Sequence, residues 1–144
     1  MKTILADVNS LYFQYVPNEF IKDFYPGDEK NMLSVCNSPH YRFLVLYQKI
    51  GSEICNPKIF NETDYIRMMI RWNRDGNHNK WKVNRFIETY ESIKQKGLLS
   101  SLVITKTPLH YKFFEQGYEI CHGHHRSACC LALNIYSISC FLKS

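Results

Sequence analysis

The chain has 144 residues, of which 45% are apolar, 15% aromatic and 22% charged, and its formal net charge is +5 at pH 7. This length suits one domain with one core, and the aromatic content excludes a disordered or low-complexity chain. No apolar run approaches the roughly 18 residues that a membrane span needs. The first apolar run ends at Asp7, which is too early for a secretory leader. We therefore expect one cytoplasmic domain over residues 1–144, with no membrane partner.

The first third of the chain predicts short strands and one well-marked helix. We expect strands at Lys2–Leu5 and Leu11–Tyr15, and a turn at Pro26–Glu29. Ser38, with a proline directly after it, is typical of a helix N-cap followed by the first helical residue. The apolar residues that follow have helical spacing, and Gly51 is a suitable stop.

Two further helices are predicted in the middle of the chain. Asn61, with Asp64 three residues later, resembles a capping arrangement for a helix that extends to Trp72. The sequence Asp75–Asn77 should break this helix, and the next should run over Asn84–Lys96. Its apolar face comprises Phe86, Ile87, Tyr90 and Ile93.

The last third predicts three strands and a fourth helix. Gly97 is placed to end the preceding helix. Strands are expected at Leu102–Ile104, Tyr118–Cys121 and Tyr136–Leu142, with a helix from the Gly123 region to about Leu133. This order predicts an α+β domain, a small mixed sheet flanked by helices.

The six cysteines are predicted to be reduced and mostly buried. They show neither the paired spacing of a disulfide scaffold nor a C-x-x-C metal or redox motif. They are Cys36, Cys55, Cys121, Cys129, Cys130 and Cys140.

Most of the positive charge lies in one basic stretch. The segment from Asp64 to Arg85 contains six cationic and two acidic residues, which give it a net charge of +4. Trp72 and Trp81 lie in the same segment. The cations are Arg67, Arg71, Arg74, Lys80, Lys82 and Arg85, and the acids are Asp64 and Asp75. Such a stretch is either a solvated surface or a contact for phosphate, a nucleotide or nucleic acid. In the last case Arg67, Arg71 and Arg74 are the candidate contacts.

The largest concentration of potentially reactive side chains lies at Cys121–Arg126. Three histidines and an arginine occur there, where a predicted strand ends and a predicted helix begins. The unpaired N–H groups and the dipole of a helix N-terminus favour an anion, and Gly123 permits close backbone approach. Arg126 adds a bidentate donor that suits phosphate oxygens. We predict a phosphate site with these residues as contacts: Gly123, His124, His125, Arg126 and Ser127. The alternative is that His125, Arg126 and Ser127 only cap and pack the helix.

A metal site is not predicted here, because contiguous histidines point in different directions. Outside this cluster, His40 and Arg42 on the Ser38-capped helix are candidate substrate contacts.

Several segments resemble the ParB/sulfiredoxin superfamily. Glu91–Leu99 followed by Leu102–Ile104 resembles its helix–glycine–strand segment, and Gly117–Ile120 followed by Gly123–Ala128 resembles its signature. The ending from Ala132 to Cys140 is similar to its helix end and last strand. The match covers about residues 84–142 and leaves 1–83 as a divergent N-terminal part.

The signature separates this chain from two branches of that superfamily. Chromosome-partition ParB proteins carry Gly-Glu-Arg-Arg, which binds CTP, and sulfiredoxins place a catalytic cysteine after the glycine, where this chain has His124. The signature is most similar to the Asp-Gly-His-His-Lys/Arg motif of ParB-like free-serine kinases. One departure is His122, which stands where that motif has an acid.

The resemblance implies a nucleotide-dependent phosphotransferase (a small-molecule kinase) or an NTPase that uses ATP, ADP or CTP with Mg²⁺ and acts on a sugar or amino-acid hydroxyl. Gly123 would hold phosphates, His125 and Arg126 would neutralise charge, and His122 or His124 would accept a proton. Two alternatives stay open: a nucleic-acid-binding module, with or without nuclease activity, and a non-catalytic member that lacks the acid at position 122.

Overall fold

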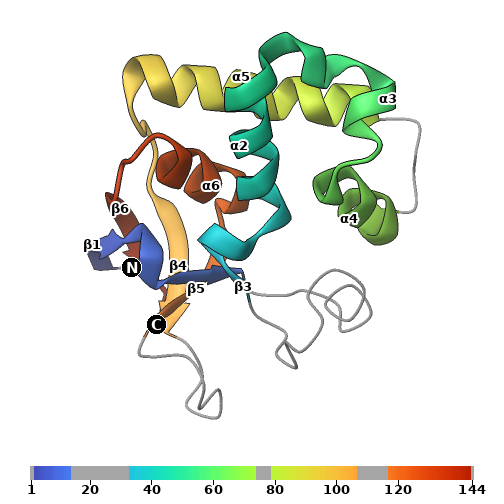
Figure 1. Cartoon of the computed structure of the whole chain (residues 1–144). Helices are drawn as coiled ribbons and strands as arrows, with labels where there is room; N and C mark the ends of the chain where they lie inside the picture. Colours follow the sequence, from blue (N-terminus) through green and yellow to red (C-terminus); the bar gives the residue numbers. More distant parts are fainter. Residues whose placement is uncertain (1, 14–32, 74–78, 107–116, 144) are drawn as a thin grey trace.

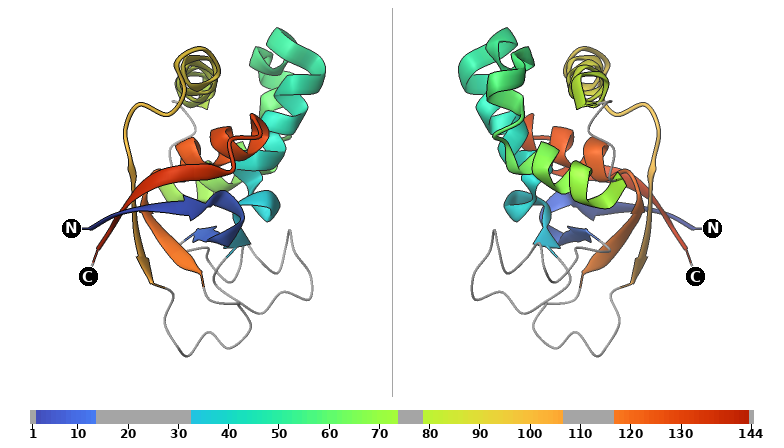
Figure 2. Two further views of the ribbon diagram at one scale, coloured as in Figure 1. Left: turned by 90° about the vertical axis from the view of Figure 1, so that its left-hand side faces the viewer. Right: turned by 90° about the vertical axis from the view of Figure 1, so that its right-hand side faces the viewer.

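The computed structural model of the chain describes residues 2–13, 33–73, 79–106 and 117–143 (Figure 1). These residues form a mixed sheet and five α-helices, which confirms the predicted α+β class. The strands are β1 Lys2–Asp7, β2 Leu11–Phe13, β3 Leu33–Ser34, β4 Leu102–Lys106, β5 Tyr118–His122 and β6 Ser137–Leu142. The helices are α2 Pro39–Ile50, α3 Pro57–Phe60, α4 Asp64–Asn73, α5 Asn79–Lys96 and α6 His124–Ala132. Helices α2, α5 and α6 lie on the same side of the sheet (Figure 2).

The six strands follow the order β1-β6-β4-β5-β2-β3. The sheet is mixed because β6 runs parallel to β4 and β2 parallel to β5, whereas the other three neighbouring pairs are antiparallel. The β4–β5 register is irregular, since Val103 faces His122 while Ile104 faces Ile120. Cys121 is therefore an extra residue, a bulge that bends β5 just before α6 begins.

The caps predicted from the sequence are confirmed at α2 and α5. The Ser38 hydroxyl accepts a hydrogen bond from the Tyr41 backbone N–H at 3.1 Å, and α2 ends at Gly51 with φ 63°. Gly97 follows α5 with φ 76°, and its N–H donates to the carbonyl of Ile93 at 2.8 Å. These positive φ angles are why glycine suits both helix ends.

Two predicted helix starts are wrong. Thr63, not Asn61, caps α4: its carbonyl accepts from the N–H of Arg67, while Asn61 accepts a hydrogen bond from the side chain of Asn79. Helix α5 begins at Asn79, earlier than predicted, because Val83 extends its buried stripe by another turn. The predicted turn at 26–29 and break at 75–77 lie outside the described residues.

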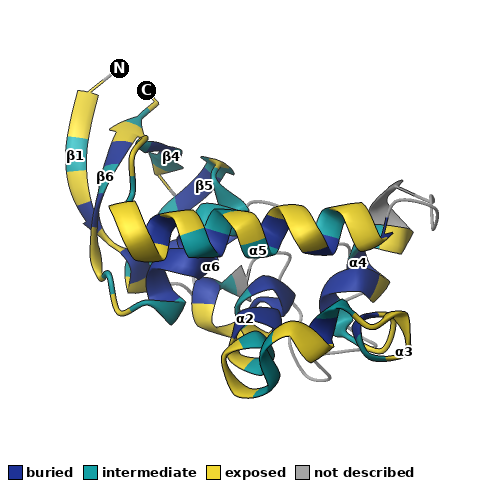
Figure 3. Cartoon of the chain, turned by 90° about the horizontal axis from the view of Figure 1, so that it is seen from above, coloured by how far each residue is buried: buried dark blue, intermediate teal, exposed yellow. Residues whose placement is uncertain are grey.

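The core fills the space between the sheet and the helices (Figure 3). Helix α6 lies at its centre, with Ala128, Cys129 and Cys130 all fully buried. All six cysteines are free, but only three are buried, fewer than predicted. Burial raises the pKa of the Cys130 thiol to about 11, so this thiol is protonated at neutral pH. In the described part of the chain, no helix has the length and apolar character to cross a membrane.

Candidate functional site

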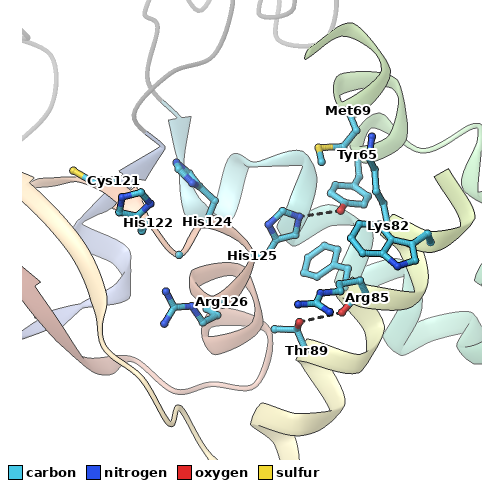
Figure 4. A pocket seen from close by; sticks show the side chains of 13 residues that line it. Tyr65, Met69, Lys82, Arg85, Thr89, Cys121, His122, His124, His125 and Arg126 are labelled. Carbon is cyan, nitrogen blue, oxygen red and sulfur yellow. Dashed lines mark hydrogen bonds between the residues drawn. The ribbon is translucent and has the colours of Figure 1, made fainter. Parts of the chain in front are cut away.

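A pocket of about 500 Å³ opens where β5 turns into α6, and α4 and α5 form its opposite wall (Figure 4). It combines the histidine cluster with residues far away in the sequence. The lining residues are Tyr65 and Met69 from α4, Trp81, Lys82, Arg85, Phe86 and Thr89 from α5, and Cys121–Arg126 from the β5–α6 turn.

Gly123 makes the turn between β5 and α6 possible. It is the N-cap of α6 with φ 113° and ψ 27°, a conformation that side-chain-bearing residues rarely adopt. A Cβ atom at this position would lie 2.5 Å from Cγ of Leu102 on β4. The fold itself therefore requires a glycine at this position. This reason is independent of the close ligand approach that the sequence predicted.

The pocket is positively charged. Lys82, Arg85 and Arg126 line it, and among its lining residues that the structure describes there is neither an aspartate nor a glutamate. The N-terminus of α6 opens onto the same space, and no side-chain cap accepts its first N–H groups. Free N–H groups and a helix dipole add to the positive potential of the three cations. The pocket is therefore suited to an anion.

His125 is a neutral, mostly buried member of the pocket wall. Its Nε2 lies 2.9 Å from the Tyr65 hydroxyl, and its ring meets the rings of His40 and Phe86 edge-on. Burial, aided by the neighbouring His124, lowers the pKa of His125 to about 4. At neutral pH it offers a hydrogen bond and not the positive charge that the sequence predicted.

His124 and His122 flank Gly123 at the other side of the pocket (Figure 4). His124 packs against Phe13 with ring centroids 4.8 Å apart, and burial and the adjacent His122 lower its pKa to about 4. His122 ends β5 and is exposed. Both imidazoles line the pocket.

Arg126 has a structural role as well as a place on the pocket wall. Its Nη1 donates to the carbonyl and the hydroxyl of Ser100, at 2.9 and 2.7 Å, and to the carbonyl of Ser101 at 3.3 Å. Its Nη2 lies 3.2 Å from where a Cβ of Gly123 would be. The guanidinium thus joins the start of α6 to the α5–β4 connection.

Three predicted contacts are not on the pocket wall. Ser127 is fully buried, and its hydroxyl donates to the carbonyl of His124 at 2.7 Å, so it faces the helix and not a ligand. His40 is 1% exposed and packs beneath His125, with its Nδ1 buried without a hydrogen-bond partner. Arg42 lies 3.8 Å from Asp64 beside a separate small groove. Neither His40 nor Arg42 lines this pocket, and their predicted role as substrate contacts stays a prediction.

The basic stretch divides between two places. Arg67 is exposed on α4 at 3.7 Å from Asp64 and does not line the pocket. The side chain of Arg71 and all of Arg74 lie outside the described residues. Lys82 and Arg85, by contrast, face the histidine cluster across the pocket. The structure thus unites part of the basic stretch with the predicted phosphate site.

Sequence reasoning missed Tyr65 and the specific cations of α5. Lys82, Arg85 and Thr89 recur at three- and four-residue spacing, which places them on one helix face, and this spacing was a usable signal. Trp81 stands at the rim, 62% exposed, with the Arg85 guanidinium carbon 5.8 Å from its ring centroid. An exposed indole beside an anion site offers a stacking surface for a nucleobase.

The donors on the pocket wall do not fit a protein-bound Mg²⁺. Mg²⁺ prefers carboxylate and water oxygens, whereas this wall offers imidazole and thiol groups. Within the described ranges, no three His, Cys, Asp or Glu side chains are grouped so that they could hold a metal ion.

No protein-family model matches the chain, and no curated protein is significantly similar to it in sequence. The resemblance to the ParB/sulfiredoxin superfamily therefore stays a prediction from the motifs.

Proposed function

We propose that this protein binds a nucleoside di- or triphosphate in the pocket at the N-terminus of α6. The observation that carries the proposal is the charge of the wall: three cations and a helix N-terminus line the pocket, and none of its described lining residues is an aspartate or a glutamate. Such a wall suits a ligand with several negative charges, as a polyphosphate has.

The arrangement of the wall orients the nucleotide. The phosphates lie at Gly123 and the first N–H groups of α6, between Lys82, Arg85 and Arg126. The base stacks on Trp81 at the rim. A volume of about 500 Å³ is within the range of nucleotide-sized ligand pockets.

The proposed reaction is phosphoryl transfer from the nucleotide to a small hydroxyl-bearing molecule, the activity that the signature resemblance implies. This chemistry needs positioned cations and in-line geometry more than covalent help from the protein. His122 and His124 line the pocket beside the phosphates. The motif's acid is absent at position 122, so binding without turnover is the alternative outcome.

The test compares two neighbouring lysines on α5. Lys82 lines the pocket, whereas Lys80 is exposed and does not line it. Isothermal titration with ATP, ADP, CTP and GTP, each with and without Mg²⁺, should detect binding of at least one nucleotide. Lys82→Ala should weaken that binding by about 10- to 100-fold, and Lys80→Ala should leave it unchanged. Equal effects of the two substitutions would contradict the proposal.

A second candidate function is binding of single-stranded nucleic acid, which the exposed Trp81 beside Arg85 favours. The two functions differ in their dependence on salt. A 20-nucleotide single strand that binds more tightly than any mononucleotide, with an affinity that falls steeply as salt rises, would replace the nucleotide proposal.

A further inference from the structure

A second groove lies directly beside the pocket. It has a volume of about 280 Å³ and lies between the C-terminal half of α5 and the connection that leads to β4. Arg85, Thr89 and Arg126 line both the pocket and the groove. The two spaces are therefore neighbours that share one wall.

Arg126 stands at the border between these two spaces. Its Nη1 donates to Ser100, which lines the groove, and Arg126 itself lines both spaces. A guanidinium in this position can contact a group that passes from one space to the other. Because it is anchored by the Ser100 and Ser101 carbonyls, it needs little reorganisation to do so.

The groove has a carboxylate, which none of the described residues that line the pocket carries. Glu88, an exposed residue of α5, gives it a carboxylate, and the hydroxyl-bearing side chains of Thr89, Ser92 and Ser100 surround it. Leu98 and Leu99 add an apolar wall, on which Leu99 is 74% exposed. Hydroxyls and a carboxylate bind the hydroxyls of a polyol, and an apolar wall packs against its carbon skeleton.

We propose that this groove binds the phosphoryl acceptor, and that the acceptor is a small polyhydroxylated molecule of the monosaccharide class. The inference rests on the proposed nucleotide function. An acceptor hydroxyl gives its proton to the Glu88 carboxylate, and its oxygen forms a bond to the terminal phosphorus of the triphosphate. The bond from that phosphorus to the bridging oxygen breaks, and the nucleoside diphosphate leaves with the electron pair.

Binding is tested first, by NMR on the ¹⁵N-labelled full chain. Addition of a non-hydrolysable ATP analogue with Mg²⁺ should shift the amide signals of Gly123–Arg126. D-Glucose, D-galactose, D-ribose and glycerol are then added separately, with L-serine as the comparison. At least one of the four polyols should shift the amides of Ser92, Gly97 and Ser100, and L-serine should not. A nucleotide response without any polyol response would overturn the acceptor assignment alone, whereas no nucleotide response would overturn the proposed function.

The role of Glu88 is tested by Glu88→Gln, with Glu53→Gln as the matched control because Glu53 is an exposed glutamate outside both spaces. Transfer of labelled phosphate from ATP to the polyol that binds should fall by about 10²-fold or more in Glu88→Gln. The dissociation constant of the nucleotide and the unfolding midpoint should not change. Transfer that equals wild type in Glu88→Gln, or that falls equally in Glu53→Gln, would overturn the proton-acceptor role.

Discussion

The hydroxyl of Tyr65 lies 2.9 Å from Nε2 of His125, and this contact ties α4 to the first turn of α6. Burial raises the pKa of Tyr65, so the phenol keeps its proton at neutral pH. The phenol donates a hydrogen bond to Nε2 of His125 when the proton of that imidazole is on Nδ1. The contact thus couples the orientation of one pocket histidine to helix α4.

Removal of that hydroxyl should affect both stability and binding. Tyr65→Phe leaves Nε2 of His125 without its partner and should lower the free energy of unfolding by about 1 kcal/mol. The control is Tyr47→Phe, which removes a hydroxyl that donates to Glu91 at 2.7 Å, away from the pocket. Urea unfolding should show similar losses for the two variants, whereas only Tyr65→Phe should weaken nucleotide binding in a titration.

Gly123→Ala should destabilise the protein strongly. The new Cβ would meet Leu102 and would require an alanine at φ 113°, so we expect a loss of about 3 kcal/mol. Gly97→Ala is the control, because its φ is also positive but nothing lies within 4 Å of the added Cβ. It should cost about 1 kcal/mol.

A double variant separates the clash at Gly123 from its backbone strain. In chemical denaturation, Gly123→Ala combined with Leu102→Ala should lose less stability than the sum of the two single losses. Additive losses would show that the contact with Leu102 is not what makes the glycine necessary.

Stability should fall in mild acid because the two pocket histidines, His124 and His125, are buried as neutral rings. Their pKa values are lowered to about 4 in the folded chain, from 6.5 in an unfolded one. Between pH 4 and pH 6.5 the unfolded state binds more protons than the folded state. The stability that the two neutral histidines contribute is therefore complete above pH 6.5 and is lost as the pH falls towards 4. For His125 the loss is on the order of 3 kcal/mol.

Urea unfolding curves at pH 7.5, 6.0, 5.0 and 4.5 measure this effect. The variant His125→Gln keeps a hydrogen-bonding group near Tyr65 but does not titrate in this range. Its stability should depend less steeply on pH than that of the wild type. Parallel curves for the two proteins would show that His125 is not the group that titrates.

Trp81 should matter for binding and not for folding. Because its side chain is largely exposed at the pocket rim, Trp81→Ala should leave the unfolding midpoint nearly unchanged. Loss of base stacking should weaken nucleotide binding by about 1–3 kcal/mol, measured by calorimetry. Tyr136→Ala, which removes a half-exposed ring outside the described pocket lining, should leave the affinity unchanged. An unchanged nucleotide affinity for Trp81→Ala would contradict the proposal that the base stacks on Trp81 at the rim.

Local signals in the sequence predicted the helices and strands. The composition of the pocket, by contrast, depends on packing between residues that are distant in the sequence. Ser38, Gly51 and Gly97 were correctly assigned because helix ends depend on the conformations of a few neighbouring residues. The start of α5 was missed because Val83 contributes to a buried stripe only when α5 packs against its neighbours.

The same limit applies to the residues of the pocket. The sequence placed His122–Arg126 at a helix start, and the structure agrees. It gave no sign that Arg126 is held by Ser100, or that His40 is enclosed by aromatic rings. Both facts depend on side chains that are distant in the sequence, so spacing alone does not contain them.

The pairing of β1 with β6 has a consequence for how the chain folds. Lys2 faces Leu142 and Asp7 faces Ser137, so the edge of the sheet joins segments from opposite ends of the sequence. Closing so long a loop has a large entropic cost, which is recovered only after β6 has been built onto β4. Strand β1 should therefore dock late in folding, and its amide hydrogens should exchange with solvent before those of the central strands β4 and β5.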